Sequence, residues 1–337
     1  MNLIELHILQ SFPVSCLNRD DVGSPKSALF GGVRRARISS QCLKRACRVL
    51  ARDEHTGFQG VRSRYLLEPF TQALLLAGMA EADAVGKAAE VCALFSKQDG
   101  KSADQVTTAV YLSPGEIQQI AEAIANGEEP KNAIKKATRL DAADISLFGR
   151  MVANDATLNV EGAAMFSHAL STHRADNEVD FFSSVDDRKG DSEDAGASMI
   201  GTLEFNSATY YRYVAINLDM LADPKHLGAL NEEERKDILR AFLTAVLRAV
   251  PGARENSMNA STLPHEVLGI RKLKGQPLQL VNAFESPVKT NGKGFGESSL
   301  SAMKDHLDKI EKTWGEQGTK HFLTEEGLDA FLNNLLS

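Results

Sequence analysis

The residues of this chain that are best suited to chemistry are cations gathered near its amino end. Between Asn18 and Arg52 lie nine lysines and arginines and two acidic residues, so this window carries a net charge of +7. The whole chain carries −7, which leaves −14 for the remainder. Local charge density governs the capture of a polyanion, although a solvated basic face is the simpler alternative. The nine cations are Arg19, Lys26, Arg34, Arg35, Arg37, Lys44, Arg45, Arg48 and Arg52.

A helix predicted over residues 41–52 would order several of these cations. Its apolar residues recur at helical spacing and form one stripe, and Ser39 and Ser40 are good N-caps. Lys44 and Arg48 lie four residues apart on one face, so they are placed to follow successive phosphates of one strand. For Arg45 and Arg52, exposure to solvent is an equally simple role.

The amino end of this helix is a second candidate for phosphate contact. The first amides of a helix lack intrahelical partners and carry partial positive charge. Ser39, Ser40 and Gln41 add neutral donors there, and Arg34, Arg35 and Arg37 would extend the cationic track. Contacts of this kind hold a nucleic-acid backbone without reading its sequence.

Apolar side chains beside polar segments are candidates for stacking on bases. Met151 follows Gly149 and Arg150, and Phe181 and Phe182 precede a polar stretch that resembles a hairpin tip over residues 186–196. Packing at the root of that hairpin is the alternative for the two phenylalanines. Three tyrosines at 210, 211 and 213 occupy a predicted strand, where RNA-recognition modules place stacking aromatics.

Catalytic patterns are poor. Asp20-Asp21 and Asp186-Asp187 are acidic pairs that could bind Mg²⁺, but such pairs in turn-rich segments are more often turn formers. His168 and His173 lack the spacing and the further ligand of a zinc site, and no phosphate-binding loop or nucleophile motif is present. We therefore predict no catalytic residue, no metal ligand and no cofactor.

The elements that must position these residues indicate an α+β fold. Without two insertions, the predicted order is strand, helix, strand, strand, helix, strand, which is the ferredoxin-like arrangement of RNA-recognition modules. Residues 1–58 and 151–337 would form this palm, with a projecting hairpin at about 180–204, and residues 59–150 a helical insertion. The palm strands are expected at 2–9, 162–173, 202–220, 265–273 and 278–285, and its helices at 41–52, 231–250, 300–313 and 325–336.

Composition agrees with a globular intracellular protein. The 337 residues are 43% hydrophobic and 25% charged, close to the globular average. Four cysteines without a Cys-x-x-Cys pair are typical of a reducing compartment. The sequence has no apolar run of membrane-spanning length and no basic leader, so we expect a cytoplasmic location without a membrane partner.

Residues 15–48 closely resemble the backbone subunit of CRISPR Cascade complexes, the CasC type found in type I-E systems. The resemblance rests on SCLNRDD at 15–21 and FGGVRRARISSQCLKRA at 30–46, and it continues at GRM (149–151), FFSSVDD (181–187) and YRY (211–213). It covers most of the chain and is weaker in the helical insertion and at the carboxyl end.

This resemblance implies a palm that carries a helical finger (59–150) and a hairpin thumb (about 180–204). Several copies would stack head to tail along one CRISPR RNA, hold its phosphates and leave most bases free to pair with a target DNA strand. Other Cascade subunits would be further partners, and cleavage would belong to a separate helicase-nuclease, so the chain itself would not be an enzyme.

The resemblance also implies site residues. Lys26, Ser39, Gln41, Lys44 and Arg48 fall where the family contacts RNA phosphates, and Met151 and Phe182 fall where apolar side chains flank a displaced base. The family usually has tryptophan where this chain has Phe181, so the role of that position is less defined. The candidate RNA-contacting residues are Asn18, Arg19, Lys26, Arg34, Arg35, Ser39, Gln41, Lys44, Arg45, Arg48, Met151, Phe181 and Phe182.

Two other functions compete with this one. A metal-dependent ribonuclease would act through Asp20 or Asp21, since related backbone subunits of other CRISPR classes cut RNA from a loop after the first strand. A metabolic enzyme would use the basic window to bind a phosphorylated small molecule. Charge spread over so long a window suits a polymer better than a single phosphate.

Overall fold

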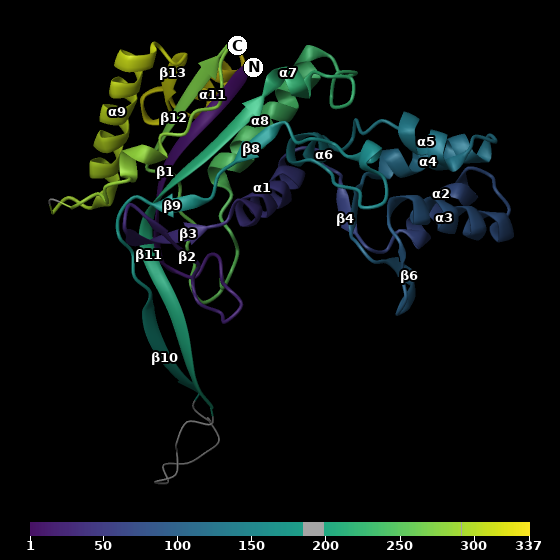
Figure 1. Ribbon diagram of the computed structural model, residues 1–337, viewed down its shortest axis with the longest axis horizontal. Coiled ribbons are helices and arrows are strands. Elements are labelled where there is room, and N and C mark those ends of the chain that lie inside the picture. Colours follow the sequence, from purple (N-terminus) through teal and green to yellow (C-terminus); the bar gives the residue numbers. More distant parts are fainter. Residues whose placement is uncertain (185–198, 291) are drawn as a thin grey trace, which may run out of the picture.

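The computed structural model of the protein describes residues 1–184, 199–290 and 292–337, and a large antiparallel sheet lies at its centre (Figure 1). Neighbouring strands of this sheet follow the order β13-β12-β1-β11-β9-β3-β2, and β8 and β10 pair with other stretches of β11. The strands are β1 (Leu3–Ser15), β2 (Ser27–Phe30), β3 (Val33–Ile38), β8 (Ala164–Phe166), β9 (Ala169–Ser171), β10 (Glu178–Ser184), β11 (Met199–Asn217), β12 (Glu266–Lys272) and β13 (Thr319–Phe322).

The palm has the predicted α+β, ferredoxin-like arrangement. Its chain order is β1, α1 (Ser40–Glu54), β8 with β9, β11, α8 (Glu232–Arg248) and β12. In space these strands follow the order β12-β1-β11-β9, so the first and third strands of the motif lie at its centre. Asn231 begins α8 with a capping box, in which its side chain and that of Glu234 each accept a backbone N–H.

Both faces of the sheet are covered by helices. Ile4, Leu6 and Ile8 of β1 pack in a core with α1, α8 and α11 (Leu328–Leu336). The residues of β1 that alternate with these three face the opposite side of the sheet. There Leu9, together with Tyr211 of β11, packs with α9 (Phe295–Trp314). The strand expected at 2–9 is confirmed, but the alternation of Ile4, Leu6 and Ile8 with polar residues, which is typical of a half-buried strand, is misleading here because β1 is buried on both sides.

A buried polar network lies between the sheet and the cover formed by α9. The Glu5 carboxylate accepts bonds from Tyr213 Oη and Leu278 N, each at 2.6 Å, and Lys272 Nζ lies 2.6 Å from Glu5 Oε2. Tyr211 Oη accepts from Leu280 N at 2.8 Å. These tyrosines are therefore buried hydrogen-bonding groups, and the suggestion that they stack on bases is wrong.

The same network explains why the strand expected at 278–285 does not form. Side chains of Glu5 and Tyr211 hold the backbone of this segment across the covered face of the sheet, so it does not pair with a strand edge. Part of it is instead the short 3₁₀ helix η2 (Val281–Phe284). The carboxyl-terminal segment also contains α10 (Leu323–Glu326), and α7 (Leu218–Leu221) follows β11.

The finger is inserted between α1 and β8 and has a core of its own, which extends from Leu66 to Ala137 and adds Val152 and Leu158. Phe70 and Phe95 stack at its centre, with ring centroids 6.1 Å apart. Short strand pairs, β4 with β7 and β5 with β6, accompany the expected helices. The finger contains β4 (Val61–Ser63), α2 (Leu67–Leu76), α3 (Glu81–Phe95), β5 (Gln98–Asp99), β6 (Ser102–Val106), β7 (Val110–Leu112), α4 (Pro114–Ala125), α5 (Pro130–Lys136), α6 (Ala143–Phe148) and η1 (Ala156–Leu158).

A two-stranded ribbon of β10 and the amino-terminal part of β11 projects from the palm as the predicted thumb (Figure 1). Its pairing runs from Glu178 opposite Phe205 to Ser184 opposite Met199. The predicted polar tip at 186–196, including the Asp186-Asp187 pair, lies outside the described residues. No helix of the described chain has the length and apolar character needed to cross a membrane.

The network beneath α9 predicts a dependence of stability on pH through His7. His7 is fully buried there, its Nδ1 lies 2.9 Å from Tyr211 Oη, and that hydroxyl oxygen also accepts from Leu280 N. Burial lowers the pKa of His7 to about 3, below the ordinary 6.5 of an unfolded chain. The unfolded state therefore binds the proton first as pH falls, and the stabilisation that is present above pH 6.5 is lost on acidification.

We expect His7 to lower the free energy of unfolding by about 2 kcal/mol between pH 7 and pH 5. Urea unfolding of the wild type and of His7→Gln at both pH values measures this contribution, because the variant lacks the titrating ring and keeps every other histidine. An equal loss of stability in both proteins would contradict the assignment.

Candidate nucleic-acid interface

Helix α1 presents the basic residues because its apolar stripe fixes its rotation. Leu43, Cys47 and Ala51 are buried against the palm, so the intervening positions face outward. Ser39 is the N-cap, as predicted, and its hydroxyl accepts from Cys42 N at 3.3 Å. Gln41 and Arg45 are exposed, and Lys44 and Arg48 are half-buried.

A groove of about 620 Å³ lies between α1 and the finger. It brings together four of the predicted RNA-contacting residues of α1 and Met151, and no aspartate or glutamate is among its lining residues. The lining residues are Gln41, Lys44, Arg45, Arg48, Arg62, Ala109, Tyr111, Phe148, Gly149, Arg150, Met151, Val160 and Gly162.

The cations of the basic window have no ion-paired carboxylate within the described part of the chain, although the buried Asp144 interacts electrostatically with Arg48 and Arg52. None of the nine forms a salt bridge there, whereas Arg64 and Arg174 elsewhere pair with Asp99 and Asp176. Lys44 Nζ instead lies 5.6 Å from the ring centre of Phe166, and burial lowers its pKa. Unpaired cations around one groove favour an anionic ligand, because such a ligand relieves their mutual repulsion.

The amides at the start of α1 are less available than the sequence suggested. Ser39 N donates to Asn18 Oδ1 and Ser40 N donates to His168 Nδ1, each at 2.9 Å. Together with Cys42 N, which donates to Ser39, three amides of this turn are occupied. The expectation of an unpaired amide cradle for phosphate is corrected, because side chains from neighbouring segments satisfy these donors.

Arg35 is not an external phosphate ligand in this structure. Its side chain is fully buried and donates to the backbone oxygens of Ser171 at 3.1 Å, Phe284 at 2.8 Å and Glu285 at 3.2 Å. A fourth bond, from Nε to the oxygen of Phe30, closes at 3.1 Å. The prediction that Arg35 extends the cationic surface is therefore wrong, since this guanidinium instead joins β3, β9 and η2.

The remaining candidates of the amino-terminal segment lie around the start of α1. Arg34 and Arg19 are exposed, and Lys26 is half-buried. Asn18 is a support for the loop, because its backbone oxygen accepts from Lys26 N at 2.8 Å and its side chain accepts from Ser39 N. The pKa of His168 is lowered mainly by burial. The nearby positive charges of Arg37 and Lys26 lower it further.

Met151 is presented at the groove by a rigid turn. Gly149 has a φ of +83°, and a Cβ atom added there would lie 2.9 Å from Val160 O. The next residue, Arg150, is buried and donates to both oxygens of the Glu116 carboxylate at 2.7 and 2.8 Å. Met151 follows directly and is 79% exposed, so an apolar surface faces solvent beside the cations.

Phe181 and Phe182 lie on the thumb and do not line the groove. They are opposite Thr202 and Gly201, so they point to opposite faces of the ribbon. Phe182 lies across Gly201, where an added Cβ atom would be 2.3 Å from its Cζ. Phe181 is 73% exposed and Phe182 is 45% exposed, so the alternative that both pack at the hairpin root is wrong.

The acidic pair of the amino-terminal loop has a structural role at Asp20. Its carboxylate accepts from Val22 N at 3.1 Å and from Ser24 N at 2.9 Å, which is the turn-forming role considered above. Within the described residues, no group of three potential ligands from histidine, cysteine, aspartate and glutamate is placed to hold a metal ion.

Sequence reasoning missed Arg62, Tyr111 and His168. Arg62 and Tyr111 come from the finger and share the groove with α1, although they are distant from it in the chain. His168 caps an amide of α1 from the loop between β8 and β9. No local motif marks these residues, because their relation to α1 exists only after the finger and palm have folded together.

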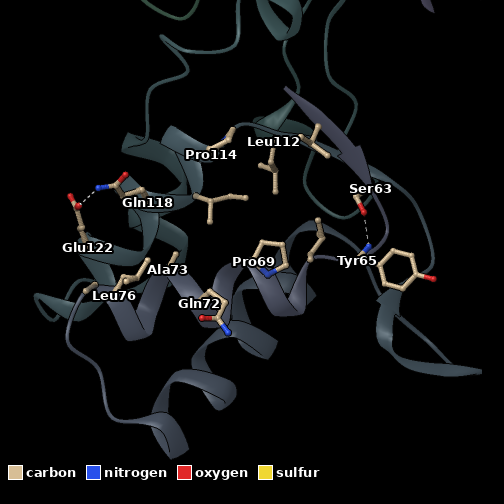
Figure 2. Close-up of a pocket in the computed structure, with 14 residues that line it drawn as sticks. Ser63, Tyr65, Pro69, Gln72, Ala73, Leu76, Leu112, Pro114, Gln118 and Glu122 are labelled. Atoms are coloured by element: carbon tan, nitrogen blue, oxygen red, sulfur yellow. Dashed lines mark hydrogen bonds between the residues drawn. The ribbon is translucent and has the colours of Figure 1, made fainter. Parts of the chain in front are cut away.

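A second groove, lined by residues of the finger alone, has a different character (Figure 2). Its volume is about 490 Å³, and it lies between α2, α4 and the β4–β7 pair. Leu66, Leu76, Leu112 and Ile117 contribute to its apolar lining, which includes no lysine or arginine. This groove is therefore not a candidate site for phosphates.

Comparisons with known proteins agree with this fold. The family model of CT1975-like proteins (Cas_CT1975) matches residues 4–334, and the chain belongs to this family. One similar solved chain is described as "CRISPR RNA-guided surveillance complex, pre-nicking" and has a TM-score of 0.78 at 26% identity, over 94% of this chain and 90% of that chain. No curated protein matched the chain.

A second solved chain, described as "CRISPR RNA-guided surveillance complex", has a TM-score of 0.64 at 23% identity, over 99% of this chain and 98% of that chain. At this identity the likeness shows the fold alone. Together, the family match and the solved chain at 26% identity confirm the resemblance to backbone-type Cascade subunits that residues 15–48 indicated.

The buried position of Arg35 predicts a loss of stability that its exposed neighbour does not share. Arg35→Ala leaves four backbone oxygens without a charged donor, and we expect it to lower the free energy of unfolding by about 3 kcal/mol. Arg34→Ala removes the same charge from the surface and should change it by less than about 0.5 kcal/mol. Urea unfolding of the two variants measures both values, and equal stabilities would show that Arg35 is not a structural residue.

Proposed function

We propose that this chain is the CRISPR RNA-binding backbone subunit of a type I-E Cascade surveillance complex, in which it holds RNA by its phosphates and does not cut it. One observation carries the proposal. The groove beside α1 gathers unpaired cations and no carboxylate, in a chain whose fold matches that of a CRISPR RNA-guided surveillance complex subunit. Other subunits of such a complex are the protein partners that this function implies.

The chemistry of the groove suits the backbone of RNA better than its base edges. Lys44 and Arg48 are cationic donors held over the aromatic rings of Phe166 and Tyr111. Contacts to phosphates fix position and carry no sequence information. In this proposal, recognition of the target DNA strand is left to base pairing with the guide.

Self-assembly is part of the proposal. Met151 lies at the groove, and Phe182 lies on the projecting thumb and does not line that groove. In this proposal the thumb of one copy reaches the groove of another, so that both residues contact one base. Such an interface uses two different surfaces of the chain, so it forms an open stack whose length a bound RNA can set.

The two competing functions find less support. A ribonuclease acting through Asp20 would have to release a carboxylate that already accepts two backbone amides. A small phosphorylated metabolite would be enclosed by few residues, whereas exposed and half-buried cations extend from Arg34 and Lys26 along α1 to the finger. We therefore retain the non-catalytic RNA-binding role.

Replacing Lys44 and Arg48 together tests the RNA-binding role. We expect Lys44→Ala with Arg48→Ala to weaken binding of a single-stranded guide RNA by ten-fold or more, since each makes a charge-assisted contact worth about 1.5 kcal/mol. The slope of log K against log salt should fall in magnitude by about 1.4, or about 0.7 for each phosphate that the variant no longer neutralises. Filter binding over a salt series measures both quantities.

The matched control is Lys97→Ala with Lys101→Ala, which removes the same charge from exposed finger positions outside the groove. This control should bind RNA nearly as the wild type does. If the folded double variant of α1 kept the affinity and salt slope of the wild type, the proposed phosphate contacts would be wrong.

Assembly and the absence of cleavage can be tested in one experiment. Purified protein is incubated with Mg²⁺ and guide RNAs of increasing length, the mass of each complex is measured by light scattering, and the RNA is then recovered and sized. We expect the mass to rise in steps of one protein copy while the RNA stays intact. RNA cleavage that disappears in Asp20→Ala or Asp21→Ala would instead support the ribonuclease function.

A further inference from the structure

The finger provides the second wall of the cationic groove. Arg62 of β4 lies directly opposite Tyr111 of β7 in their antiparallel pair, so both side chains project from the same face of this small sheet. That face is turned to α1, because Arg62, Tyr111 and Arg48 line one groove. Arg62 is exposed, and no described residue forms a salt bridge with it.

Strand alternation in β4 separates two environments. Val61 and Ser63 line the apolar groove of Figure 2, together with Leu112 of β7. Arg62, between them, points to the opposite side and into the cationic groove. A residue of the finger is thus placed among the basic residues of the palm by the local geometry of the strand.

Tyr111 connects this wall to α1. The Arg48 guanidinium lies over its ring, 5.5 Å from the ring centre, and the Tyr111 hydroxyl donates to Asp144 Oδ2 at 2.6 Å. Asp144 is fully buried and also accepts from Gly60 N at 3.2 Å. The ring is therefore fixed from behind and can hold the orientation of Arg48, whose charge stays available to a ligand.

Close packing at Gly60 fixes where β4 begins. A Cβ atom there would lie 2.6 Å from Asp144 Oδ1 and 2.7 Å from Tyr111 Cε2, and the oxygen of Gly60 accepts a bond from Arg52 of α1. The carboxyl-terminal end of α1 is thus tied to the residue that precedes β4. This connection holds the two walls of the groove in a fixed relation.

We propose that the finger is a phosphate-binding element, in which Arg62 contacts the same RNA strand that α1 holds and Tyr111 is a positioning residue for Arg48. This inference rests on the proposed RNA-binding function and adds a contact outside the palm and thumb. Arg48 and Arg62 face one groove from separate elements, and no carboxylate lines that groove. Their charges therefore repel each other, and a phosphate bound between them removes that repulsion.

Arg62→Gln tests the phosphate contact. We expect RNA affinity to fall by about ten-fold and the magnitude of the salt slope to fall by about 0.7, the value for one phosphate of a single strand. The control is Lys87→Ala, which removes one charge from an exposed, ion-paired position of α3 and should leave both quantities unchanged. Circular dichroism and a urea midpoint confirm that each variant is folded.

A double-mutant cycle tests Tyr111. Tyr111→Leu should weaken RNA binding by about three-fold in the wild-type background and have no further effect when Arg48 is already alanine, because it acts through Arg48. Tyr111→Phe keeps the ring beneath Arg48 and should retain most of the affinity. An equal decrease in affinity from Tyr111→Leu in both backgrounds would show a general structural effect and overturn the positioning role.

The outcomes separate this inference from the proposed function. If Arg62→Gln binds RNA as the wild type does while the Lys44 and Arg48 variant is weakened, the finger contact is wrong and the RNA-binding function stands. If neither variant changes RNA binding, the proposed function itself is wrong. If both weaken binding and both lower the salt slope, the finger and the palm grip the same strand.

Discussion

Like-charged side chains that face one groove without a carboxylate between them are the constraint on which the interface depends. Lys44 and Arg48 from the palm and Arg62 from the finger meet in this way, and their repulsion must be opposed by the rest of the fold. The buried stripe of α1 fixes two of these residues, and the tie from Arg52 to Gly60 fixes the opposite wall. Because the positive charges in this groove repel one another, the groove is suited to binding a polyanion, whose negative charges reduce that repulsion.

The chain uses arginine for two opposite purposes. Arg35 and Arg150 are buried, where one joins four backbone oxygens and the other binds both oxygens of the Glu116 carboxylate. The fork of the guanidinium suits this role, because one side chain satisfies several acceptors at once. Arg34 and Arg48 remain at the surface, although Arg34 is the immediate neighbour of Arg35. Arginine content alone therefore does not measure the charge that a ligand meets.

This palm differs from a simple RNA-recognition module because both faces of its sheet are covered. Modules of that kind stack bases on aromatic residues of an open sheet. Here α9 and the 278–285 segment close that face, and Tyr211 and Tyr213 become hydrogen-bonding groups inside it. The nucleic-acid interface that we propose therefore lies along α1 and on the two insertions. The finger and thumb thus supply surfaces that the sheet itself no longer offers.

Sequence alone determined the elements whose signals are local. The stripe and cap of α1 and the ferredoxin-like order of strands and helices follow from patterns in the sequence, and all were predicted. The Lys44–Arg48 spacing likewise placed both residues in the groove. Segment 278–285 was misjudged because its apolar residues suit a strand, whereas distant side chains, Glu5 and Tyr211, decide its path.

Only the tertiary structure decided which basic residues face a ligand and which elements meet. Arg34 and Arg35 have the same charge and adjacent positions, so the burial of one and the exposure of the other depend on where β2, β9 and the segment at η2 place four backbone oxygens. Arg62 and Tyr111 carry no motif, and they join α1 because the fold places β4 and β7 across the groove from this helix. The physical reason is the distance along the chain over which each effect acts. Helix and strand periodicity depend on residues a few positions apart, whereas burial and charge pairing depend on residues that are far apart in the sequence and that folding brings together.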